Sequence, residues 1–239
     1  MQTPKSPPAG ADKFAPELQK LTTRFNEGRQ AVFTAYQKAP EANQMKVYTD
    51  GMARLNRELG PQFLALANKA RGTVTGLRAR MQHLNMAEDA KPQVILQLAQ
   101  DVVRIEGKNP DMARAITQLG FLRYQLRQPA EQQKLITLLL DAERITPYPG
   151  VKAQAMYQRG QLLYDARKKP EALALMKQTV GKYPTTTAAA DAKRTIFELE
   201  NLQIGMVAPE MTGKDETDTP FKLTDYRGKV VVLDFWGFW

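Results

Sequence analysis

Residues 155–164 read Ala155-Met156-Tyr157-Gln158-Arg159-Gly160-Gln161-Leu162-Leu163-Tyr164, and they decide the fold class of the N-terminal part of this chain. They lie inside a predicted helix from Val151 to about Ala166, with Gly160 near its middle. A residue without a side chain in mid-helix lets a neighbouring helix approach closely, as stacked helical hairpins require. The turn Arg167-Lys168-Lys169, then Pro170 and a second helix to Lys182, complete one predicted hairpin.

The preceding stretch repeats this plan. A helix from Asp111, its predicted N-cap, to Leu126 is followed by a turn and by a partner helix from Ala130 to about Ile145. Gly120 lies 40 positions before Gly160, at the equivalent point of its helix. The sequence therefore predicts two similar hairpins, at about 111–146 and 151–184.

Helical periodicity also extends towards the N-terminus, where proline and glycine divide it into segments. The predicted helices cover 14–39, 41–59, 62–86 and 92–106, with a closing helix at 188–202. Residues 72–76 weaken the helix at 62–86, so two shorter helices are the alternative there. Gly60-Pro61 is expected to separate the second predicted helix from the third, because proline lacks a backbone N–H. Residues 1–12, rich in proline, are expected to form a disordered tail, so the helical domain spans 13–202.

Residues 155–164, continued by Glu171-Ala172-Leu173 and Tyr183-Pro184, resemble a tetratricopeptide repeat over about 35 residues. The resemblance implies a helical solenoid that offers a groove to a peptide or protein ligand. The first hairpin fits the repeat more loosely, because the spacing exceeds the usual 34 residues. A plain helical bundle is the alternative reading of the same pattern.

Composition narrows the classes of function. The chain has 239 residues and a formal net charge of +9, but acidic residues are interspersed among the basic ones, so we expect no nucleic-acid partner. No apolar stretch is long enough to span a membrane, and the first residues do not resemble a signal peptide. The chain contains no cysteine, and its one histidine, His83, is expected on a helix surface. We therefore expect no metal site and no cofactor.

After Leu202 the pattern changes from helical periodicity to short runs punctuated by glycine and proline, which predicts a domain boundary between 202 and 203. The last twelve residues are Gly228-Lys229-Val230-Val231-Val232-Leu233-Asp234-Phe235-Trp236-Gly237-Phe238-Trp239. Val230 to Phe235 is nearly all apolar, as in a strand covered by helices on both faces. Gly228 is expected to adopt a left-handed conformation and Thr224 to cap a single turn before it.

Three pieces of this segment resemble, in order, the opening of TlpA-type thioredoxin-like and AhpC/TSA-type redoxin proteins. The pieces are an entry motif at 204–210, a hairpin and turn at 220–229, and a central strand at 230–236. The Trp-x-x-Trp pair formed by Trp236 and Trp239 departs from the peroxiredoxin pattern and favours disulfide exchange. Residues 203–239 are thus expected to be the N-terminal part of a thioredoxin-like α/β domain, ending just before the Cys-x-x-Cys of that family. The fold class expected for the whole chain is mostly α, followed by this opening β segment.

The resemblance also implies roles for individual residues. Asp234 would lie buried beneath the dithiol and accept a proton, while Trp236 and Trp239 would pack around the dithiol and dock the substrate. The implied function is thiol–disulfide exchange with a disulfide-containing or dithiol protein, outside the cytoplasm. Because the chain has no cysteine, it is itself expected to be inactive. The alternative function is that of a non-catalytic helical scaffold that binds a partner.

Overall fold

The computed structural model describes residues 12–87 and 90–237, and most of the predicted tail at 1–12 lies outside this range. The chain forms two compact units, one up to Lys193 and one from Arg194 onward. This division falls inside the last helix, whereas the predicted boundary after Leu202 follows the change in sequence character. Within the described residues the protein is mostly helical, with one small two-stranded antiparallel sheet.

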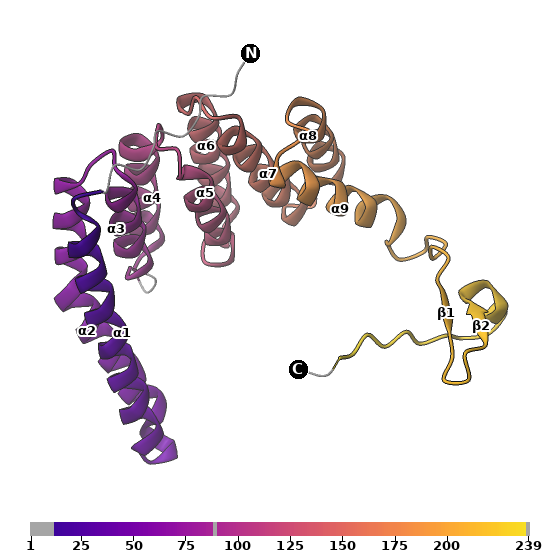
Figure 1. The fold of residues 1–239 in the computed structure, drawn as a ribbon, viewed down its shortest axis with the longest axis horizontal. Coiled ribbons are helices and arrows are strands. Elements are labelled where there is room, and N and C mark those ends of the chain that lie inside the picture. The colour runs from indigo at the N-terminus through magenta and orange to yellow at the C-terminus, as the bar shows by residue number, and fades with distance from the viewer. Residues whose placement is uncertain (1–11, 88–89, 238–239) are drawn as a thin grey trace. The chain divides into compact units, whose positions relative to one another are not determined.

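The first unit is built from eight helices and the start of a ninth, within the part of the chain that the structure describes (Figure 1). Their bounds are α1 Ala15–Lys38, α2 Glu41–Lys69, α3 Val74–Asn85, α4 Pro92–Glu106, α5 Met112–Phe121, α6 Pro129–Ile145, α7 Pro149–Asp165, α8 Lys169–Lys182 and α9 Thr187–Asn201. A 3₁₀ turn, Leu122–Tyr124, extends α5.

Packing between helices follows the order of the chain. Helix α1 packs on α2, α2 on α3 and α3 on α4, whereas further along α4 packs on α6 and α5 on α7. Extensive contacts also join α6 with α7 and α7 with α8. Helices α4 and α6 lie side by side although they are two apart in sequence, and so do α5 and α7.

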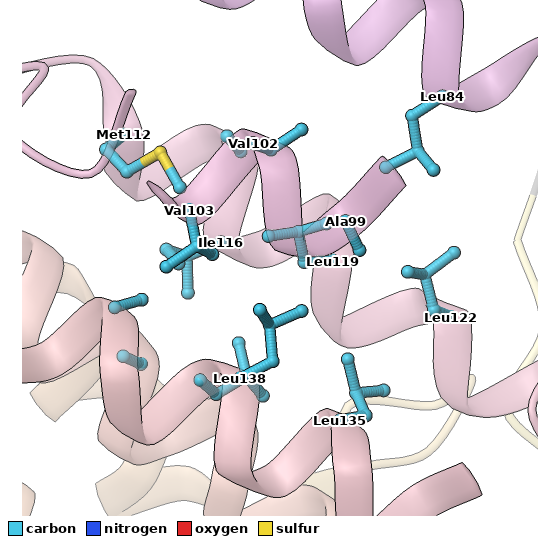
Figure 2. Close-up of a cluster of buried hydrophobic side chains, with 14 of the residues drawn as sticks. Leu84, Ala99, Val102, Val103, Met112, Ile116, Leu119, Leu122, Leu135 and Leu138 are labelled. Carbon is cyan, nitrogen blue, oxygen red and sulfur yellow. The ribbon is translucent and has the colours of Figure 1, made fainter. Parts of the chain in front are cut away.

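The largest hydrophobic core of the first unit joins α3 to α7. Figure 2 shows the part where side chains from α3, α4, α5, the 3₁₀ turn and α6 converge, among them Val102, Ile116 and Leu119, which are fully buried. A second cluster fills the space between α1, α2 and α3 around Phe63, whose ring meets that of Phe25 edge-on. These buried residues are the apolar stripes that made the helices visible in the sequence.

The break predicted at Gly60-Pro61 is wrong. Helix α2 continues through both residues to Lys69, and the chain leaves the helix only before Gly72, which has a positive φ of 79°. Pro61 removes the hydrogen bond to the carbonyl of Arg57, but Leu59, Gly60 and Phe63 are all buried around it. Packing of this stretch against α1 and α3 outweighs the cost of one proline in the helix.

The two predicted mid-helix glycines do lie at close approaches between helices. A Cβ atom at Gly120 of α5 would collide with the side chain of Gln158 on α7. A Cβ atom at Gly160 of α7 would lie 3.1 Å from Cγ of Met176 on α8. Asp111 is the N-cap residue of α5 as predicted, but its side chain makes no capping hydrogen bond and instead pairs with Arg78 at 3.5 Å.

The second unit contains the hairpin expected before the central strand. Strand β1, Thr212–Lys214, pairs antiparallel with β2, Pro220–Lys222, and Gly213 lies opposite Phe221. A 3₁₀ turn at Leu223–Tyr226 follows, and Gly228 has the expected positive φ, 81°.

The strand predicted at Val230 to Phe235 is not formed. Residues 230–237 adopt neither helix nor strand, and the side chains of Val230, Val232 and Phe235 are 98%, 87% and 79% exposed. A strand is held by the hydrogen bonds and burial that neighbouring strands supply, and no strand among the described residues pairs with this run. High apolar content alone therefore does not make it a strand.

Candidate functional site

The predicted redox-site residues lie in the exposed run just described. Asp234 is exposed rather than buried beneath other groups, and Trp236 is 70% exposed. Trp239 lies outside the described residues. The structure therefore brings Asp234 and Trp236 into one short segment but does not build an enclosed site around them.

The hairpin that precedes this run is held by two carboxylates. Glu210 accepts hydrogen bonds from the hydroxyl of Thr224 at 2.6 Å and from its backbone N–H at 3.1 Å. Asp215 accepts from the N–H and hydroxyl of Thr217 at 2.8 and 2.7 Å. These hydrogen bonds lower the pKa of both carboxyl groups. The largest cause is the side-chain bond from Thr224 for Glu210 and the side-chain bond from Thr217 for Asp215. Thr224 is thus committed to Glu210 and does not cap the following turn, where Asp225 instead accepts from the Lys222 N–H at 2.8 Å.

The most deeply buried charges of the described residues are Arg80 of α3 and Glu106 of α4. Nε of Arg80 lies 3.7 Å from Oε1 of Glu106, and the two side chains are 5% and 0% exposed. Arg80 also donates to Asn68 at 2.9 Å, and Glu106 accepts from the N–H of Gly72 at 3.2 Å. Burial raises the pKa of the Glu106 carboxyl, although the Gly72 N–H and Arg80 oppose the shift.

This pair was missed in the sequence, although a signal was present. Glu106 continues the stripe formed by Ile95, Ala99 and Val102 on α4, where an apolar residue belongs. A charged residue on such a stripe indicates a buried partner. Because both side chains are almost inaccessible to solvent, the pair ties the α2–α3 connection to α4 and offers no surface to a substrate.

His83 is another correction to the sequence reading, since it is half-buried against α2 and not on an open helix surface. Its Nδ1 lies 3.0 Å from the carbonyl oxygen of Gly60. A carbonyl only accepts, so Nδ1 carries the proton. Burial lowers the pKa of the imidazole, so the neutral ring with its proton on Nδ1 is favoured near pH 7.

Arg123 organises a pair of exposed aromatic rings at the end of α5. Its guanidinium lies 4.5 Å from the ring centroid of Tyr124 and 5.5 Å from that of Phe121, and the two rings stack at 6.3 Å. The same guanidinium pairs with Asp165 of α7 at 3.1 Å. Its positive charge is therefore already neutralised within the fold.

Several grooves run between helices of the first unit, among them one of about 420 Å³ between α2 and α3 and one of about 440 Å³ between α1 and α2. Another, of about 400 Å³, lies between α4 and α6, and one of about 270 Å³ lies between α3 and α5. Within residues 12–87 and 90–237, no three acidic or histidine side chains gather as a metal site would require. No helix in the same ranges is long and apolar enough to cross a bilayer.

Comparisons of the chain with protein-family models, with curated proteins and with solved structures find no match.

Proposed function

We propose that this chain joins a helical, tetratricopeptide-like interaction domain to the opening segment of a TlpA- or redoxin-type thioredoxin-like domain. The protein to which that segment belongs is a thiol–disulfide oxidoreductase. The observation that carries the proposal is the order of three motif pieces, at 204–210, 220–229 and 230–236, followed by the aromatic pair Trp236 and Trp239.

The local structure of the second unit supports this assignment. A short antiparallel hairpin, a single 3₁₀ turn and a left-handed Gly228 come in the order that the resemblance implies before the central strand. The Glu210–Thr224 bonds hold the entry motif against that turn.

In the proposed reaction a cysteine thiolate attacks a substrate disulfide, which forms a mixed disulfide and releases one substrate thiolate. A second cysteine then attacks the mixed disulfide and releases the reduced substrate. In this scheme Asp234 accepts the proton of the second cysteine, once neighbouring strands bury its carboxylate. Trp236 and Trp239 form the surface on which the substrate docks. Neither cysteine is among the 239 residues.

The helical unit supplies a second binding function in this proposal. Close packing at Gly120 and Gly160 supports a stacked hairpin arrangement, which leaves helix faces available to a peptide or protein partner. By the resemblance of residues 204–239 to TlpA-type proteins, the proposed location of the protein is outside the cytoplasm.

The decisive test is to read the gene beyond the codon for Trp239. A Cys-x-x-Cys there, with a proline loop further on, supports the oxidoreductase. A stop codon, or serines in place of the cysteines, contradicts it.

Activity of the present chain gives an independent check. We expect no reduction of insulin disulfides by this polypeptide in the presence of dithiothreitol beyond the rate with dithiothreitol alone, because it has no thiol. A longer form that contains the cysteines should accelerate the reaction. Measurable acceleration by the cysteine-free chain would contradict the proposed chemistry.

The second candidate is a non-catalytic helical interaction protein. It is favoured by the extent of the helical unit, which contains most of the buried core. On this reading, partner binding persists when residues 204–239 are deleted, and no form of the protein exchanges disulfides.

A further inference from the structure

The far half of the hairpin formed by α1 and α2 buries none of its side chains fully. Figure 1 shows both helices extending past α3, and none of residues 22–58, all of which the structure describes, is buried. Even apolar side chains between the two helices, such as Val32 and Leu55, are only half-buried. Two helices alone cover only part of each other's apolar stripe, so this half of the hairpin lacks the burial that stabilises the rest of the helical unit.

Three aromatic rings and one cation lie along this part of the hairpin. The ring of Phe33 stacks on that of Tyr36 at 5.9 Å, and Tyr36 meets Tyr48 of α2 edge-on at 6.1 Å. Phe33 is nevertheless 45% exposed and Tyr48 is 41% exposed. Arg29, one turn before Phe33, lies 5.9 Å from the ring centroid of Phe25 and makes no ion pair within the part of the chain that the structure describes.

The groove of about 440 Å³ between α1 and α2, here called the hairpin groove, brings these groups to one face. Its lining comes from one stripe of each helix: Asn26, Arg29, Gln30, Phe33, Tyr48 and Met52. No acidic side chain is among these residues, so the charge of the groove is that of Arg29. The hairpin groove therefore has a cation towards one end and exposed aromatic rings towards the other.

The positions of these groups along the hairpin are symmetric about one level. Gly51 of α2 lies against Val32 of α1. The next residue of α2, Met52, is therefore level with position 31 of α1, midway between Arg29 and Phe33. Four helical residues cover about 6 Å, so the cation and the ring lie about 3 Å to either side of this level.

This symmetry makes the hairpin groove complementary to itself. A two-fold rotation about an axis through the level of Met52 stacks two hairpins face to face and antiparallel, with Arg29 of one copy against Phe33 of the other. A guanidinium over an aromatic face is attracted to it, and the rotation makes this contact twice, as an isologous interface does. Met52 then faces its own counterpart on the axis.

We propose that the chain forms a dimer in which two α1–α2 hairpins pair through their hairpin grooves as an antiparallel four-helix bundle. The second copy covers the aromatic side chains that one hairpin leaves exposed and supplies a partner to Arg29. This inference does not depend on the redox proposal. It also concerns helices that lie outside the two hairpins predicted to be repeats, at 111–146 and 151–184.

Cross-linking tests this geometry without interference, because the chain contains no cysteine of its own. Met52→Cys in the full chain is expected to join two copies through a short bismaleimide, since position 52 lies on the axis. Ala31→Cys is the matched control, because Ala31 is exposed at the same level of the hairpin but does not line the groove. Association through residues 230–236 would link both variants equally, so the comparison separates the two kinds of contact.

Exchanging the two side chains tests the contact itself, with Val232→Lys as a common background that suppresses association through residues 230–236. Phe33→Arg brings guanidinium groups of the two copies together and should weaken the dimer about tenfold or more in sedimentation velocity. Phe33→Arg combined with Arg29→Phe restores the pair in reverse order, and the dissociation constant should return to within about threefold of the original. Circular dichroism should show the same helix content in all three proteins.

Three results would overturn the proposal. The first is sedimentation of the chain as a monomer at every concentration at which it stays in solution. The second is equal cross-linking of Met52→Cys and Ala31→Cys. The third is an exchanged double variant that associates no better than Phe33→Arg, which would mean that the two hairpins do not meet in this antiparallel arrangement.

Discussion

At Gly120 the spacing between two helices depends on the absence of one methyl group. The space that a Cβ atom would need is occupied by Gln158, which is itself 4% exposed and has little room to move. Replacing a helical glycine by alanine usually stabilises a helix, by about 0.5–1 kcal/mol. Here the collision between α5 and α7 should make the same replacement destabilising.

We therefore predict that Gly120→Ala lowers the free energy of unfolding by about 1–3 kcal/mol, as other overpacked cores do. Urea denaturation followed by circular dichroism measures this change. Gly181→Ala on α8 is the matched control, because nothing lies within 4 Å of the added methyl group, and it should be neutral or slightly stabilising. Equal effects of the two substitutions would show that α5 and α7 are less closely packed than described.

Glu106 predicts a pH dependence of stability. Its pKa in the folded protein is raised above the ordinary value of 4.5, with burial as the main cause. A raised pKa means that the folded state holds the proton more tightly than the unfolded state does. The contribution to stability is then fully present below pH 4.5 and is lost as the pH rises through the raised pKa.

The corresponding experiment compares Glu106→Gln with the unmodified chain in urea between pH 4 and pH 8. Glutamine at position 106 does not titrate, so the variant lacks this contribution at every pH. The difference in free energy of unfolding between the unmodified chain and the variant should therefore shrink as the pH rises and then level off. If the variant instead loses more free energy of unfolding, relative to the unmodified chain, as the pH rises, then attraction by Arg80 outweighs burial at this site.

At the scale of a single element, α2 carries a proline in its interior. Pro61 cannot donate to the carbonyl of Arg57, yet the helix continues for eight further residues to Lys69. Alanine at this position would restore the missing donor and remove the ring that crowds the preceding turn.

Pro61→Ala is predicted to raise the free energy of unfolding by about 1–3 kcal/mol, with the upper end set by the intrinsic propensities of the two residues. Thermal and urea denaturation would both report the gain. Pro92→Ala is the control, because Pro92 is the first residue of α4, where its missing N–H has no helical partner to lose. A clear loss of stability in Pro61→Ala would show that contacts of the proline ring with its surroundings matter more than the missing hydrogen bond.

At the scale of the whole molecule, the exposed run at 230–236 is expected to promote association between copies of the chain. It is apolar, prone to β structure and bears one charge, Asp234. Its backbone donors and acceptors are not paired in a sheet within the described residues. Such a run tends to pair with the same run of another molecule.

Deleting residues 204–239 should therefore abolish concentration-dependent aggregation, which static light scattering of both forms at matched concentrations would measure. Val232→Lys in the full chain is a point-substitution counterpart and should reduce aggregation without removing the unit. If the full chain and the deletion form are equally soluble, the run is covered in solution and its interpretation as an unpaired strand is wrong.

The sequence by itself determined most of the helices. Apolar residues at helical spacing, interrupted by prolines such as Pro40, placed α1 and α4 through α8 close to their observed bounds, because these signals act within a few residues of the chain. The close approaches at Gly120 and Gly160 were predictable for the same reason, since equivalent positions in a repeated pattern perform equivalent packing.

Only the tertiary structure decided where local and long-range effects oppose each other. Because its residues are buried against α1 and α3, α2 continues through Pro61. Folding also brings Arg80 and Glu106, 26 positions apart in the chain, together as a buried pair. The apolar run ending at Phe235 shows the converse, since its local pattern is that of a strand but no neighbouring strand in the described residues completes it. A helix satisfies its hydrogen bonds within its own segment, whereas a strand and a buried ion pair depend on residues that local sequence does not contain.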